Sequence, residues 1–190
     1  HGGVEHVILD FPKSTLKKLC IGDRVQIVAN GAGLELTNCP AVRVMSCDPR
    51  LLNRWGVRLV SGRLRVPVTH RVPAGIMGSG LGSPTCHKGD YDIQMFDDEI
   101  VAKHGLASLR FGDLVAITDA DHSFGRRYLS GAVSIGVIVH SRSDVSGHGP
   151  GVATLLTSAE GAIDPVIDNN ANLGKVLKLG RWRRKARSRA

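Results

Sequence analysis

The sequence predicts a mainly β protein, barrel- or sandwich-like, with two related β-rich lobes and two or three short helices. Three observations support this class: short apolar runs are separated by turn residues, one strand-forming motif occurs twice, and helical patterns are confined to short segments. The 190 residues, 42% of them hydrophobic, are enough for one domain that buries a core without disulfides. We expect a single β-rich domain over residues 1–174.

Seven segments are candidate strands, because each is rich in β-branched and apolar residues and is flanked by glycine, proline, asparagine or aspartate. In chain order they are residues 4–9, 24–29, 42–47, 64–68, 114–118, 132–140 and 152–157. Three short helices are expected between them. Ser14 can cap a helix over 15–19, Asp48 one over 50–55, and Asp97 one that runs to Lys103 and ends at Gly105.

The motif Leu-x-x-Gly-Asp-x-Val-x-Ile occurs at residues 19–27 and again at 109–117. In each copy the glycine permits a turn, the aspartate can bond the amides of that turn, and the alternating Val and Ile side chains face a core. The repeat therefore predicts two related β-rich lobes packed together within one domain.

The formal net charge of +8 comes from one end of the chain. Residues 175–190 contain eight basic and no acidic residues, which leaves 17 basic and 17 acidic residues in 1–174. We predict a basic mobile tail over 175–190 that is either a solvated end or an electrostatic contact for nucleic acid. Nucleic acid is not an expected partner of the rest of the chain.

The spacing of the cysteines and the length of the apolar runs indicate where in the cell the protein is expected. The four cysteines, at positions 20, 39, 47 and 86, lack the spacing of a zinc site or of a disulfide framework, so reduced thiols in the cytoplasm are expected. No run approaches the ~18–20 apolar residues of a membrane helix, and a membrane partner is not expected.

The glycine-rich stretch 74–84 is the candidate substrate loop. Its bare backbone amides, at Gly78, Ser79, Gly80 and Gly82, could hold a carboxylate or phosphate of a small molecule. The alternative is that the glycines only let another backbone pass close by. Pro84 prevents the helix that a dinucleotide-binding loop requires.

Two pairs of aspartates are the candidate metal ligands. Asp90 and Asp92 point to the same side of an extended segment, and Asp119 and Asp121 form a second pair after the strand 114–118. Carboxylate oxygens converging in this way suit a divalent metal ion. Aspartates are also common turn formers, which is the structural alternative.

Three histidines are candidates for catalysis. His122 follows the second aspartate pair, and His148 lies between glycines in the loop 146–151. In the strand 132–140 the odd positions form an apolar face, whereas the even positions carry small residues, including Ser134, that lead to His140. This face leaves room for a substrate or for a closely packed backbone, so Ser134 is a candidate substrate contact and His140 a candidate ligand or general acid/base.

Four segments carry a resemblance to a known family. Residues 73–80, the Asp90-Tyr91-Asp92-Ile93 stretch, 131–136 and 147–152 resemble a family of prokaryotic proteins catalogued as a domain of unknown function. The resemblance runs from residue 1 to about Thr157. It implies that this chain corresponds to the C-terminal portion of a longer protein.

A second resemblance concerns chemistry. Residues 89–94, a Gly-Asp strand and then residues 119–122 follow the order of elements in acetamidase/formamidase enzymes, which are β-rich metal-dependent hydrolases of small amides. In this sequence Asp90 stands where that family has asparagine, and Gln94 where it has lysine.

The sequence contains no nucleophile elbow, P-loop, HExxH or EF-hand pattern. Our leading hypothesis is a metal-assisted hydrolase of a small polar compound, such as an amide, with a divalent metal ion as cofactor. The alternative is a non-catalytic β-rich ligand-binding or assembly module. As partners we expect a small-molecule substrate and either the N-terminal part of the same precursor or further copies of this chain.

Overall fold

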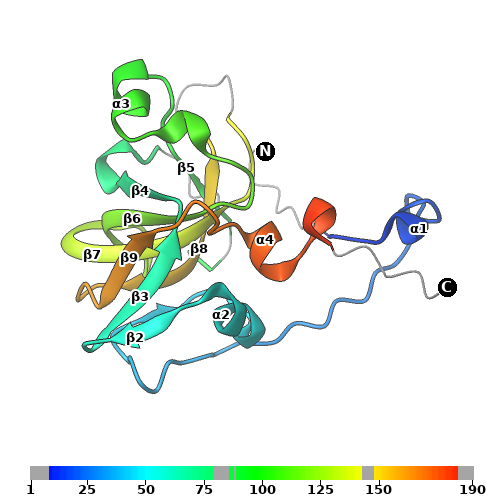
Figure 1. Ribbon diagram of the computed structural model, residues 1–190, viewed down its shortest axis with the longest axis horizontal. Helices are drawn as coiled ribbons and strands as arrows, with labels where there is room; N and C mark the ends of the chain where they lie inside the picture. Colours follow the sequence, from blue (N-terminus) through cyan, green and yellow to red (C-terminus); the bar gives the residue numbers. More distant parts are fainter. Residues whose placement is uncertain (1–8, 79–85, 88, 143–147, 184–190) are drawn as a thin grey trace.

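The computed structural model describes residues 9–78, 86–87, 89–142 and 148–183. Its largest element is a six-stranded sheet (Figure 1). Five strands lie side by side across it in the order β1 (Arg43–Val44), β8 (Gly151–Ser158), β7 (Arg127–Ile138), β6 (Leu114–Asp121) and β4 (His70–Pro73). The short strand β5 (Tyr91–Asp92) also pairs with β8.

A second sheet has three strands in the order β2 (Arg58–Val60), β3 (Arg63–Val68) and β9 (Ile163–Ile167). β2 and β3 form a hairpin, whereas β9 returns from the far end of the chain to pair in parallel with β3. The mainly β class with short helices is confirmed. Among the described residues the two sheets do not close into a barrel.

The large sheet is buried on both faces, which explains why its central strands are apolar at nearly every position. Along β6, Leu114 and Ala116 belong to the core cluster shared with β3, β9 and α2, whereas Val115 and Ile117 belong to a second cluster on the opposite face. All four side chains are fully buried. The second cluster contains Tyr91 and so connects β5 to the sheet.

The helices are short and their boundaries follow local signals. α2 (Pro49–Trp55) begins after Asp48, whose side chain accepts a hydrogen bond from the amide of Arg50, and ends at Gly56 in the left-handed conformation. α3 (Asp98–Lys103) begins after Asp97, which caps two amides. Both agree with the sequence-based predictions. Within the described chain, short 3-10 turns lie at 74–76, 106–108 and 180–182.

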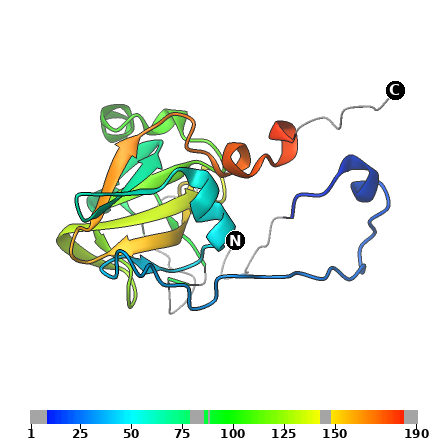
Figure 2. The same ribbon diagram turned by 60° about the horizontal axis from the view of Figure 1, so that its bottom comes forward.

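The N-terminal part of the described chain differs from expectation. α1 (Lys13–Leu16) lies apart from both sheets in two views (Figures 1 and 2), and residues 24–29 form no strand. Ile27 and Val28 are 60% and 76% exposed. The first copy of the repeated motif is therefore part of an exposed arm rather than of a second lobe, and the candidate strand 4–9 lies almost wholly outside the described residues.

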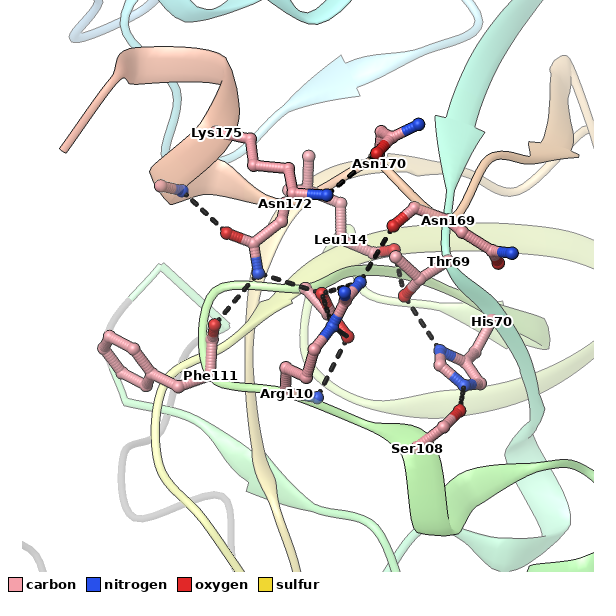
Figure 3. Close-up of polar contacts among 12 residues, drawn as sticks. Thr69, His70, Ser108, Arg110, Phe111, Leu114, Asn169, Asn170, Asn172 and Lys175 are labelled. Carbon is pink, nitrogen blue, oxygen red and sulfur yellow. Dashed lines mark hydrogen bonds and ion pairs between the residues drawn. The ribbon is translucent and has the colours of Figure 1, made fainter. Parts of the chain in front are cut away.

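The C-terminal segment is tied to the body through Asn172. Its side chain caps α4 (Leu173–Leu177) by accepting from the amide of Gly174, and donates to the carbonyl of Phe111 and to the buried carboxylate of Asp113 (Figure 3). α4 crosses the boundary after Gly174 at which the basic tail was expected to begin. Residues 184–190 of that tail lie outside the described residues.

The four cysteines are free thiols. Burial, and to a smaller extent the nearby Asp48 carboxylate, raises the pKa of the Cys47 thiol to about 11. That thiol is therefore protonated and unreactive near neutral pH.

Among the described residues, no helix has the length and apolar composition needed to cross a membrane.

Candidate metal centre

Three neighbouring strands bring acidic and imidazole side chains together at one end of the large sheet. β8 lies between β5 and β7, and Asp92 of β5 is the register partner of Gly151 of β8. On the other side of β8, the amide of Val139 donates a hydrogen bond to the carbonyl of Gly151. Gly151 therefore lies between Asp92 and the chain end of β7, where His140 follows Val139.

The side chains of Asp90, Asp92 and His140 meet over Gly151. His140 Nε2 lies 2.7 Å from Asp90 Oδ2 and 3.2 Å from Asp92 Oδ1, and the three candidate ligand atoms lie within 4.8 Å of one another. A Cβ atom on Gly151 would lie 1.9 Å from Asp90 Oδ2 and 2.2 Å from His140 Nε2. The cluster can occupy this space because residue 151 has no side chain.

The hydrogen bonding of His140 indicates which of its ring nitrogens carries a proton. Nδ1 lies 2.9 Å from the carbonyl oxygen of Ser141, and a carbonyl only accepts, so Nδ1 is the donor. In the neutral imidazole, Nε2 then presents a lone pair toward Asp90 and Asp92. Metal-binding histidines typically have this arrangement, with the second ring nitrogen donating to a carbonyl or carboxylate.

The two carboxylates concentrate negative charge in a partly dehydrated place. The Asp92 side chain is 6% exposed, and burial raises its pKa, against the opposing effect of His140. Asp90 Oδ2 is buried and accepts no hydrogen bond from a described residue, although His140 Nε2 is near. His148 lies at the rim, 40% exposed, with Nδ1 3.3 Å from Asp92 Oδ2. Positive charge, from protonated imidazoles or from a cation, would stabilise this arrangement.

His122 lies in a different environment. It is fully buried, its Nε2 is hydrogen-bonded to the Tyr91 hydroxyl, and its Nδ1 lies 2.9 Å from Thr154 Oγ1. Its amide donates to Thr157 Oγ1 at 3.0 Å. Burial lowers the pKa of His122 to about 4, so the ring is neutral at pH 7. Because both ring nitrogens have hydroxyl partners, we assign His122 to the internal packing rather than to catalysis or metal binding.

Asp119 and Asp121 are also separate from the cluster. Asp119 lies at a bulge of β6 with φ of 58°, and its carboxylate accepts from the amide of Gly131 at 2.8 Å. Asp121 is buried and accepts from Ser123 and from Arg127. The predicted set of four aspartate ligands is therefore divided: the first pair meets at the cluster, and the second pair stabilises turns and strand ends.

Ser134, which the sequence predicted to contact a substrate, contacts protein atoms instead. Ser134 is fully buried and donates to the carbonyl of Ala120, with Thr157 Oγ1 at 2.8 Å. At Gly136 a Cβ atom would lie 2.3 Å from Val152. Protein atoms thus fill the face of β7 that was expected to leave room for a substrate, so Ser134 is not accessible to one.

The glycine loop lies mostly outside the described residues, which include Gly78 but not Ser79, Gly80 or Gly82. The amide of Gly78 donates to the carbonyl of Asp92, and its own carbonyl accepts from Arg126. Gly78 therefore fixes the backbone of Asp92 rather than presenting a free amide.

Gly151 was not among the site residues predicted from the sequence. The only local signal was a glycine immediately before the strand 152–157 and three residues after His148, since glycine in a strand often marks a close approach. Which side chains approach it depends on the pairing of β8 with both β5 and β7.

The chain matches two models of one family, each described as a domain of unknown function (DUF4438): the C-terminal domain over residues 54–177 and the N-terminal domain over residues 1–53. It belongs to this family, as the sequence motifs predicted. The chain is also similar to the crystal structure of TM1086, with 42% identity and a TM-score of 0.70 over 76% of this chain. That match covers 50% of the TM1086 chain, so this sequence spans about half the length of that relative. No curated protein matches the sequence.

Proposed function

We propose that Asp90, Asp92 and His140 bind a divalent cation, and that this member of the DUF4438 family is a metal-assisted hydrolase of a small polar compound such as an amide. The observation that carries the proposal is the convergence of three ligand atoms over Gly151, at distances that fit one ion. A mixed set of carboxylate and imidazole ligands suits Zn²⁺ or Mn²⁺. A cation bound by few protein ligands can acidify water and polarise a carbonyl group.

The roles of three side chains follow from their positions. Asp92 is the more enclosed of the two carboxylates in the cluster, and a bound cation would offset the cost of burying its charge. His140 would bind through Nε2 while Nδ1 holds the ring against the carbonyl of Ser141. His148, at the exposed rim, is placed to complete the ligand set or to carry a proton between the site and solvent.

The first experiment is metal analysis of protein purified without chelator, followed by calorimetric titration of chelator-treated protein with Zn²⁺ and with Mn²⁺. We expect one ion per chain. Asp92→Asn and His140→Gln should each weaken binding by more than the ~10–100-fold typical of losing an outer partner. Asp119→Asn is the matched control, because that aspartate accepts from the amide of Gly131 in β7, outside the cluster. Absence of stoichiometric binding by the wild type would remove the proposal.

The second experiment tests hydrolysis. Ammonia release from formamide, acetamide and longer amides should depend on the added cation and should be lost in Asp92→Asn. Cation binding without turnover of any amide would keep the cation site and exclude the amidase.

The filled face of β7, around Ser134 and Gly136, favours a second candidate, a non-catalytic binding or assembly module. In that case Asp90→Asn and Asp92→Asn change only the melting temperature.

A further inference from the structure

A small cavity lies on the same chain segments as the metal cluster. Its volume is about 320 Å³, and Ser141 and Pro150 line it, immediately next to His140 and Gly151 in the chain. The remaining walls are mostly apolar and belong largely to the second core cluster, with Met95, Val101, Leu106, Leu109 and Ile138 among them. Cavities that bind small organic ligands typically have volumes of ~300–1,000 Å³ and apolar walls with a few polar groups.

The polar side chains of the cavity are mainly basic. Arg110 is already engaged, because its guanidinium bonds the buried Asp113 carboxylate and the carbonyl of Asn169 (Figure 3). Arg142 also lines the cavity, and no hydrogen bond or ion pair joins it to a described residue. None of the lining residues within the described part of the chain is acidic. Phe111, on the same wall, is 56% exposed, which leaves apolar surface at the opening.

We propose that this cavity binds a small organic carboxylate with an apolar body, and that Arg142 pairs with its carboxylate group. A guanidinium matches a carboxylate in charge and in its paired hydrogen bonds, and the apolar walls would cover the hydrocarbon part. We identify this ligand with the apolar portion of the substrate of the neighbouring metal cluster. This identification rests on the proposed function. The substrate class would then be small amides or related compounds that carry an apolar acyl chain and a carboxylate.

Hexanoate is the probe for this cavity, titrated into the whole, chelator-treated chain and followed by ligand-observed NMR. We expect saturable binding that Arg142→Gln weakens at least ~10-fold, which is the scale of losing one charged hydrogen-bonded pair. Ala107→Trp should abolish it by filling the cavity, since Ala107 is an exposed lining residue. Arg58→Gln, which removes a guanidinium from the exposed strand β2, should leave binding unchanged.

Further comparisons test the charge of the ligand and the location of its binding site separately. Hexylammonium has the same chain with opposite charge, and equal binding of hexanoate and hexylammonium would overturn the assignment to Arg142, as would unchanged hexanoate affinity in Ala107→Trp. No saturable hexanoate binding would overturn the proposal altogether. The Asp92→Asn variant separates it from the cation site: hexanoate binding that persists there supports the cavity even if the chain binds no cation.

Discussion

Two histidines of this chain, His122 and His140, lie in polar clusters of opposite kinds. The partners of His122 are the hydroxyls of Tyr91 and Thr154, and the group is closed and fully buried. His140 Nε2 faces the carboxylates of Asp90 and Asp92, and the His140 side chain is 27% exposed. A neutral ring between hydroxyls is satisfied without further atoms, whereas two converging carboxylates favour an added positive charge. Of the two clusters, only the second is suited to bind a cation.

The largest expected effect comes from Gly151→Ala. The new Cβ would displace Asp90 and His140, whose side chains can rotate away, so we expect a folded protein whose Zn²⁺ affinity falls by more than ~100-fold. Gly75→Ala is the matched control, because its Cβ would meet its nearest neighbour, the hydroxyl of Tyr128, at an ordinary 3.5 Å. Circular dichroism and calorimetric titration of both variants measure the result. Unchanged affinity in Gly151→Ala would place the cation elsewhere.

The next largest expected effect is a loss of folding stability at acidic pH, caused by His122. Because burial lowers the pKa of His122 from 6.5 to about 4, the unfolded chain takes up a proton more readily than the folded chain. Stability from this group is therefore present above pH 6.5 and is lost as the pH falls toward 4. Between pH 7 and pH 5 we expect a loss of about 2 kcal/mol.

Urea unfolding of the wild type and of His122→Gln at both pH values measures this contribution. The variant should lose less stability on acidification, while its Zn²⁺ affinity at pH 7 stays close to that of the wild type. The same pH dependence in both proteins would show that His122 is not the group responsible.

The smallest expected effect is a gain of folding stability at acidic pH, caused by Asp92 of the metal cluster. Burial raises the pKa of Asp92 above 3.8, so in the metal-free protein this group favours folding at low pH and loses that contribution as the pH rises through its folded pKa. Relative to Asp92→Asn, metal-free wild type should gain stability on acidification in urea unfolding. Zn²⁺ affinity should fall over the same range, because protons compete at Asp92. A constant difference between the two proteins would contradict the assigned shift.

Much of the candidate site could be predicted from local patterns. The spacing of Asp90 and Asp92 placed two carboxylates on one side of an extended segment, and the face of small residues in the strand 132–140 pointed to His140. The meeting of these residues depends on β8 pairing with both β5 and β7. The same local reasoning selected Asp121 and His122, because residue types alone do not indicate whether hydroxyl or carboxylate partners surround a histidine.

The repeated motif separates local from tertiary causes most clearly. In both copies the glycine has a positive φ, 99° at Gly22 and 82° at Gly112, and the aspartate accepts from the amide three residues before it, at 2.8 Å in Asp23 and 2.9 Å in Asp113. The sequence by itself determined this turn, because the bond from the aspartate to the amide three residues before it lies within the motif and forms in both copies.

Tertiary structure decided the conformation of the segment after each turn. After Asp113 the chain becomes β6, paired with β7 and β4 and fully buried at Ile117. After Asp23 the matching segment pairs with no strand of the described chain, and Ile27 is 60% exposed. A strand requires hydrogen-bond partners and a covering apolar surface from distant parts of the chain, and no local pattern supplies these.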